Sequence, residues 1–214
     1  MSSTTNVLSS KGGAAVAAQF ALVGLSATGT AAQAATWDID GGHSNVGFSV
    51  RHLMVSNVRG TFKTVSGTVE LDEADPSKAK VVATIDTKSV DTGDGKRDEH
   101  LRSPDFFDSA KNPQMTFTSK SVKRAGKGWK VAGDLTIRGV TKEVVLDVST
   151  LAPSVKDPWG GIRTGFTATT SINRKDYGME WNKALDNGGI ALGNDVKVTL
   201  EIELSKKAPT TAKN

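Results

Sequence analysis

Val196–Leu204, VKVTLEIEL, is the stretch of sequence that decides the fold. Apolar residues occupy every second position of this stretch, and Lys197, Thr199, Glu201 and Glu203 fill the positions between them. Successive side chains of an extended strand point to opposite faces, so this spacing produces one apolar and one polar face. The stretch therefore predicts a β-strand that packs one side against a core.

The same two-residue period recurs along most of the chain. It is seen in Val46–Val50, Val65–Leu71, Trp129–Ile137 and Phe166–Ile172, and glycine-containing turns such as Ala125–Gly128 separate such stretches. Turns of this kind between alternating segments are typical of antiparallel strands. We count about eight strands, mostly with short connections. The pattern predicts an all-β fold, either an antiparallel barrel or two stacked sheets.

Two long segments interrupt the strand pattern. The first is Lys96–Phe117, KRDEHLRSPDFFDSAKNPQMTF, which places a dense group of charges directly before the pair Phe106–Phe107. We expect one or two helical turns within Lys96–Ser109, broken by Pro104. The second is Arg174–Asn194, rich in Gly and Asn. Long insertions in a compact β domain are usually functional or disordered, and the first insert suggests the mouth of a pocket.

The two ends of the chain differ from the strand-rich part. In residues 1–34, Lys11 is the only charge, and it is followed by a short apolar stretch that ends in Ala32-Gln33-Ala34. This pattern is typical of a secretory signal peptide and is too short to span a membrane. We expect a signal peptide in residues 1–34, a single β-barrel domain in 35–206 and a flexible tail in 207–214. We expect no membrane span after removal of the signal peptide, and no disulfide, because the chain has no Cys.

Several kinds of chemistry find little support in the sequence. The only histidines, His43, His52 and His100, form no metal-binding spacing, and no Ser lies in a Gly-x-Ser-x-Gly turn. Asp98, Glu99 and His100 could act as general acids or bases. A run of charged residues like this one is more often a solvent-exposed face with carboxylates that cap a helix. Acidic residues interleave with the basic ones, which argues against nucleic-acid binding. We therefore expect no catalytic residues, no metal, no cofactor and no nucleic-acid partner.

An apolar ligand is the remaining prediction from the residues. An eight-stranded barrel has room either for packed side chains or for one small ligand. Small residues recur on the predicted strands where large aliphatic residues would fill a lumen: Gly60, Gly67, Gly133, Ala168 and Thr170. These small residues favour a cavity. The alternative is that the glycines allow strand twist and β-bulges in a barrel whose interior is filled.

A series of motifs also occurs in a fixed order along the chain. The motifs are His43–His52 (HSNVGFSVRH), Gly60–Phe62 followed by Gly67, Arg97–Leu101 (RDEHL), Asp105–Asp108 (DFFD), Pro113–Phe117 (PQMTF), Gly133–Thr141 (GDLTIRGVT) and Asn173–Met179 (NRKDYGM). In this order, and across Trp37–Leu204, the chain resembles the YceI-like family of periplasmic polyisoprenoid-binding proteins. Asp176–Asn194 departs from the family in length and polarity, which leaves the shape of the entrance and the preferred chain length open.

The resemblance implies an antiparallel, eight-stranded, extended lipocalin-like barrel with a short helical insert. It implies an exported, periplasmic protein that holds a polyisoprenoid, an isoprenoid quinone or a long-chain alkyl lipid in an apolar lumen, for transport or storage, with a link to stress responses. The expected lumen residues are Phe48, Phe62, Met115, Phe117, Leu135, Ile137, Phe166 and Ile172. The expected rim residues, which would meet the head group, are Arg97, Asp98, His100, Arg102, Phe106 and Phe107.

Three other functions stay open at this point. The first is a redox-associated quinone carrier that docks a membrane cytochrome, through a face such as Arg174–Trp181. The second is an enzyme that acts on an isoprenoid lipid, and the third is a structural module with a filled core. We also expect that an open edge beside the first strand allows a homodimer.

Overall fold

The structure is a computed structural model that describes residues 34–186 and 188–208. The described part consists almost entirely of strands, with one α-helix, α1 (Gly95–Arg102), and three short 3-10 helices, η1 (Pro76–Lys78), η2 (Thr87–Ser89) and η3 (Arg174–Tyr177). The strands are β1 (Ala35–Ile39), β2 (Asn45–His52), β3 (Ser56–Phe62), β4 (Val65–Leu71), β5 (Lys80–Asp86), β6 (Val90–Asp91), β7 (Gln114–Ala125), β8 (Gly128–Ile137), β9 (Val140–Val148), β10 (Val155–Lys156), β11 (Ile162–Asn173) and β12 (Leu192–Lys206).

Eight of these strands close into a ring. The order around the ring is β11-β9-β8-β7-β5-β4-β1-β12, and β12 pairs back to β11. Every pairing in it is antiparallel. The predicted antiparallel eight-stranded barrel is thus confirmed, and the alternative of two stacked sheets is wrong. The remaining strands pair with strands of this ring or with one another. Strand β2 pairs with β12, β3 pairs with β2, β6 pairs with β3, and β10 pairs with the start of β11.

Strand β12 holds the barrel together because it has three partners. One edge pairs with β11 from Arg163↔Ser205 to Asn173↔Asp195. The other edge pairs first with β1 near Leu204 and then with β2 toward Leu192. Strand β1 is flanked on both sides, by β4 and by β12, and β2, the first strand that the sequence predicts, is flanked by β12 and β3. The open edge that we expected beside the first strand, as a route to a homodimer, is therefore not present.

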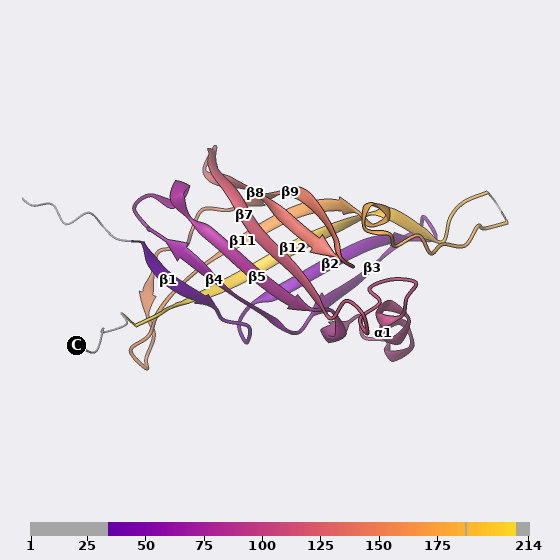
Figure 1. The fold of residues 1–214 in the computed structure, drawn as a ribbon, viewed down its shortest axis with the longest axis horizontal. Helices are drawn as coiled ribbons and strands as arrows, with labels where there is room; N and C mark the ends of the chain where they lie inside the picture. The colour runs from indigo at the N-terminus through magenta and orange to yellow at the C-terminus, as the bar shows by residue number, and fades with distance from the viewer. Residues whose placement is uncertain (1–33, 187, 209–214) are drawn as a thin grey trace, which may run out of the picture. The chain divides into compact units, whose positions relative to one another are not determined.

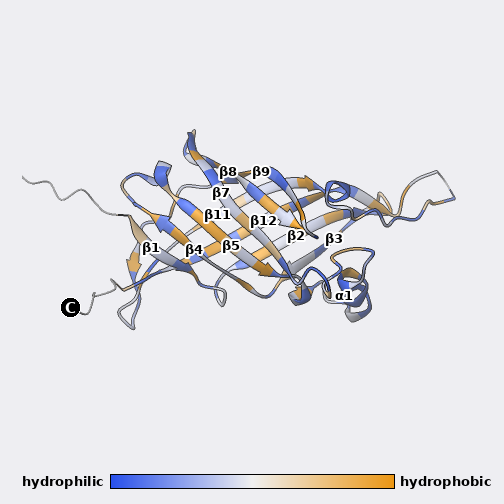
Figure 2. Cartoon of the chain, in the orientation of Figure 1, coloured by the Kyte–Doolittle hydropathy of each residue, from blue (hydrophilic) through white to orange (hydrophobic). Residues whose placement is uncertain are grey.

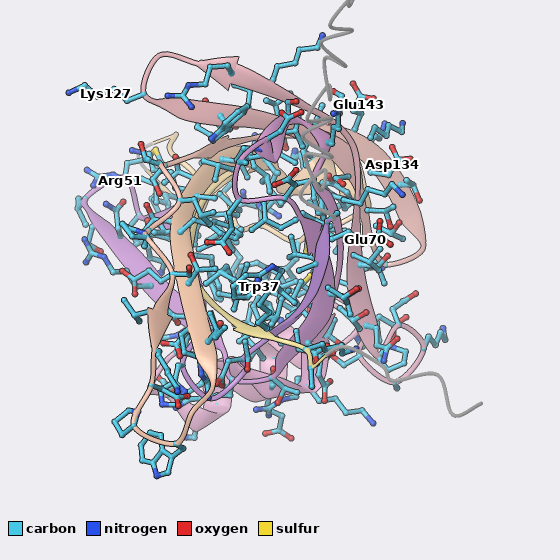
Figure 3. All side chains as sticks on the ribbon, turned by 90° about the vertical axis from the view of Figure 1, so that its left-hand side faces the viewer. Trp37, Arg51, Glu70, Lys127, Asp134 and Glu143 are labelled. Carbon is cyan, nitrogen blue, oxygen red and sulfur yellow. The ribbon has the colours of Figure 1, made fainter. Side chains whose placement is uncertain are left out.

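The core lies inside the ring. Trp37 and Leu204 are fully buried, and the clustered apolar residues come from nearly every strand of the ring. Along the strands, apolar and polar residues alternate, whereas α1 is mostly hydrophilic (Figure 2). Seen from the end where β1 begins, Trp37 lies within the ring, and labelled charged side chains such as Glu70, Lys127 and Glu143 lie outside it (Figure 3). The two-residue period thus separates lumen from solvent.

The predicted helical insert is confirmed as α1. Asp94 caps the helix by accepting hydrogen bonds from the backbone N–H groups of Lys96 and Arg97, at 3.0 and 3.2 Å. The helix ends at Arg102, and Ser103 and Pro104 follow in extended or turn conformation. Helix α1 and the connection from β11 to β12 lie at the same end of the barrel (Figure 1). This end therefore carries both of the long insertions.

Within the described part of the chain, no helix is long and apolar enough to cross a membrane. The predicted signal peptide falls almost entirely in residues 1–33, and most of the predicted tail falls in 209–214, which lie outside the described residues. Lys207 and Ala208, the start of that tail, follow the last strand without regular structure.

Two of the small residues noted on the strands sit beneath aromatic rings. A Cβ atom added at Gly60 would lie 2.4 Å from Cζ of Phe48, and one added at Gly133 would lie 2.5 Å from Cζ of Phe117. Both rings face the lumen. These glycines therefore let an aromatic ring lie flat against the wall, and the space that they free is filled by that ring.

Replacing Gly133 with Ala tests this packing. The new methyl group would meet both the Phe117 ring and the carbonyl oxygen of Thr118 at 2.5 Å, so a ring or a strand must shift. We expect a loss of about 1–3 kcal/mol in the free energy of unfolding, measured by urea denaturation. Gly95→Ala is the matched control, because nothing lies within 4 Å of its Cβ position and alanine suits a helix. Equal stability of the two variants would contradict the packing role.

Candidate functional site: an apolar lumen with a basic end

A cavity of about 570 Å³ runs inside the barrel. Its wall is built from residues of every strand except β6 and β10, so β2 and β3 contribute to it together with the eight strands of the ring, and the residues there are overwhelmingly Val, Leu, Ile and Phe. A volume of this size falls in the range of ligand pockets. All eight residues expected in the lumen line the cavity: Phe48, Phe62, Met115, Phe117, Leu135, Ile137, Phe166 and Ile172.

Four of the six residues expected at the rim also line the cavity, namely Arg97, His100, Phe106 and Phe107. Phe106 is buried, with 6 % of its surface exposed, so the aromatic pair forms part of the wall and not an exposed patch. The T-shaped contact of Phe107 with Phe62, 5.3 Å between ring centroids, connects the insert to strand β3. The insert therefore covers one end of the lumen.

The other two expected rim residues, Asp98 and Arg102, do not line the cavity and instead fasten the insert. Asp98 is buried and accepts hydrogen bonds from the backbone N–H of Thr92, at 2.9 Å, and from its hydroxyl group. Arg102 donates to the backbone carbonyls of Lys88 and Val90. These bonds tie α1 to the segment that precedes it. The bonds from Thr92 also supply the donors that a buried carboxylate such as that of Asp98 needs.

Three rings at this end connect the two insertions. His100 makes T-shaped contacts with Phe106 and with Trp181, each with 5.0 Å between ring centroids, and Phe106 lies 5.5 Å from Trp181. The Nε2 atom of His100 is 2.8 Å from a carboxylate oxygen of Asp105. All three rings line the cavity. Trp181, which belongs to the candidate docking face Arg174–Trp181, is therefore a wall residue contributed by the β11–β12 connection.

Arg174 is the other residue that sequence reasoning missed. Its side chain is buried and lines the cavity, where its guanidinium donates to the carbonyl oxygens of Gly193, Met179 and Trp181. Burial lowers the pKa of Arg174 below its usual value. The spacing of the sequence indicates this inward position. Arg174 follows Ile172 by two residues, so its side chain continues the inward face of β11. We had assigned it to the loop and to an outward docking face.

The histidine spacing argued against a metal, but the fold brings one group of potential ligands together outside the lumen. Asp40, His43 and Glu203 place one donor atom each within 4.8 Å of one another. The guanidinium of Arg163 lies between them and contacts Asp40 and Glu203, while its Nε donates to Asp157 at 3.0 Å. A cation already neutralises these carboxylates, so we read the cluster as an ion-pair network.

This network makes a pH-dependent contribution to stability. Partial burial raises the pKa of Asp40, but hydrogen bonds from His43 and Arg163 outweigh it and lower the pKa to about 2, from an ordinary value of 3.8. A carboxylate with a lowered folded pKa stabilises the protein above its unfolded pKa, and the contribution is lost as the pH falls toward 2. Allowing for the partial exposure of the pair, we expect about 1–2 kcal/mol.

The variant Asp40→Asn checks this by urea denaturation between pH 6 and pH 2. We expect the variant to be less stable than the wild type at pH 6 and the difference to shrink below pH 4. Asp195→Asn, at an exposed position with no ion pair in the described residues, controls for general charge effects. A difference that stays constant across this range would mean that ionisation of Asp40 does not stabilise the fold.

Comparison with known proteins agrees with this architecture. Residues 37–204 match the model of the YceI-like domain. Protein YceI of Escherichia coli O157:H7 is 48% identical over 143 residues, which cover 67% of this chain and 74% of that protein. The crystal structure of the Campylobacter jejuni YCEI protein is 34% identical, with a TM-score of 0.62 over 73% of this chain and 90% of that one.

A more distant structure shares the fold. It is a polyisoprenoid binding domain from Saccharophagus degradans, which is 18% identical, with a TM-score of 0.59 over 82% of this chain and all of that chain. At this identity the likeness concerns the barrel alone. The family match extends over most of the described barrel, and the identity to YceI proteins is high over two thirds of the chain. The chain therefore belongs to the YceI-like domain family.

Proposed function

We propose that this protein binds one long, linear, apolar lipid, a polyisoprenoid or an isoprenoid quinone, inside the barrel. The observation that carries the proposal is the cavity itself, which is enclosed by the ring and lined by apolar side chains along its length. A solid barrel of this size would fill that space with side chains. The polyisoprenoid-binding relative with the same fold, from Saccharophagus degradans, supports the choice of ligand class.

The wall suits a chain without polar groups. Burial of apolar surface contributes roughly 25 cal/mol per Å², and it has no preferred direction. Aromatic side chains from separate strands, such as Phe48, Phe117 and Phe166, offer flat surfaces to such a chain. Length and branching of the ligand would then determine the affinity more than hydrogen bonds do. The eight lumen residues are the proposed contacts of the chain, and Arg97, His100, Phe106 and Phe107 are the proposed contacts near the head group.

We further propose that the protein acts in the periplasm after export and carries or stores its lipid, including under stress. The pattern of residues 1–34 supports export. Binding without turnover is the activity that the lumen supports best, because its inner wall in the described residues offers side chains for burial and few groups for proton transfer.

Two tryptophan substitutions on β12 test whether the ligand binds in the lumen. Leu200 and Thr199 are neighbours on β12, and Leu200 lines the cavity whereas Thr199 is exposed on the outer face. We expect Leu200→Trp to lower the affinity for a long polyprenol by at least about tenfold, since the indole occupies the space of the chain. Thr199→Trp should bind like the wild type.

The measurement is a titration with a radiolabelled or fluorescent polyprenol, together with thermal unfolding of each variant. A folded Leu200→Trp variant that binds with full affinity would contradict the proposal, since the ligand would then lie elsewhere. If both folded variants lose affinity equally, the loss does not come from filling the lumen, and this result would also contradict the proposed site.

A further inference from the structure

We propose that the α1 end of the cavity is a subsite for an oxyanion, a phosphate or a carboxylate, at the head of the bound lipid. This inference rests on the proposed function, because it assigns the head group of the same ligand. Its basis is the sign of the charges around the cavity, the charge of Arg174, which forms no ion pair in the described residues, and the unpaired ammonium group of Lys96.

The charged and titratable residues that line the cavity are all basic. They are His52, Lys96, Arg97, His100 and Arg174, and no Asp or Glu lines the cavity in the described residues. All five lie at one end. Lys96, Arg97 and His100 come from α1, Arg174 begins the β11–β12 connection, and His52 pairs with Leu192 at the start of β12 (Figure 1). Among the described residues that line the opposite end, none is charged, and the polar groups are the hydroxyl of Ser149 and the indole N–H of Trp129, which pairs with Val148.

The nearby carboxylates offset this basic character only in part. Asp98 is held by Thr92, and Asp105 pairs with His100. Asp94, which caps α1, interacts electrostatically with Lys96 and Arg97 from outside the lining of the cavity. Glu180 lies 3.7 Å from Lys175, outside the lining of the cavity. In the lining itself the positive charges therefore face an apolar space, where an anion would be attracted more strongly than in water.

Arg174 is the centre of this end because its charge is buried and forms no ion pair in the described residues; the charge of Glu180 acts on it only from beyond ion-pair distance. No carboxylate of the described residues lies within ion-pair distance of its guanidinium, whose partners are three carbonyl oxygens and, at 3.4 Å, the side-chain oxygen of Asn194. That last bond engages one of the two N–H groups on Nη2. A buried cation is costly unless it is paired, and the carbonyls satisfy hydrogen bonds but not charge. An oxyanion would supply both.

Lys96 adds a second, exposed cation to the lining of this end. It is exposed in the first turn of α1, and its ammonium group makes no hydrogen bond or ion pair within the part of the chain that the structure describes. Arg97, by contrast, is held by Thr92 through its Nε and Nη2 atoms. The fixed guanidinium groups and the free ammonium group together match an anion that sits at the end of a chain buried in the lumen.

Matched ligand pairs test the subsite. The probes are geranylgeranyl phosphate against geranylgeraniol, and palmitate against hexadecanol, each titrated into the delipidated protein at pH 7.5. We expect the charged member of at least one pair to bind about tenfold or more tightly than its neutral partner. The preference should fall as salt rises. Preference in the first pair alone identifies a phosphate head, and preference in the second pair alone identifies a carboxylate.

Variants then assign the preference to residues. Lys96→Gln should reduce the ratio of charged to neutral affinity about threefold, and Arg174→Gln should reduce it about tenfold. Lys127→Gln is the matched control, because Lys127 is exposed and lies outside the cavity lining (Figure 3). Since Arg174 also holds the β11–β12 connection, Lys96→Gln decides the matter if Arg174→Gln does not fold.

The outcomes separate this inference from the proposed function. If the charged and neutral members of both pairs bind equally well, the lumen binds lipids but the oxyanion subsite is wrong. If the preference is present but unchanged in Lys96→Gln and in folded Arg174→Gln, the anion binds at another place, and the assignment is wrong. If none of the four ligands binds, the proposed function fails, and this inference fails with it.

Discussion

The pairing of β12 with β11 is the interaction on which the rest of the structure depends. Eleven residue pairs join these strands and turn an open sheet into a closed ring. Closure pairs the edges of the eight ring strands with one another and turns the apolar faces of these strands toward a common interior. The alternation that each strand shows separately then produces a single apolar space. The lumen is therefore a consequence of closure together with the two-residue period.

The two ends of this space differ in chemistry. At one end Trp37 is fully buried, with the Lys206 ammonium 5.1 Å from its ring centroid. At the other end α1 and the β11–β12 connection supply His100, Trp181 and Arg174. An amphiphile with a long apolar tail and one polar head would match this difference between the two ends if its head lay at the α1 end. The proposed direction of the ligand thus rests on where the chain places its two long insertions.

Much of this account could be predicted from the sequence, and the exceptions have physical reasons. Strand periodicity alone predicts which face of each strand is apolar, so residues such as Phe48 and Phe166 could be placed in the lumen in advance. Periodicity says nothing about what a side chain meets across the barrel, so the rings that cover Gly60 and Gly133 were not foreseen. Local charge density misled us about Asp98, because burial depends on the donors that Thr92 provides. Arg174 was missed because its residue type suggested solvent, although its spacing from Ile172 placed it inside.

Native mass spectrometry of the purified protein, followed by organic extraction, tests the central claim most directly. We predict a bound species that is released on unfolding and that extraction identifies as a long isoprenoid or alkyl lipid. An empty protein that also fails to bind added polyprenols and isoprenoid quinones would contradict the account, because the lumen would then have no role in holding a lipid.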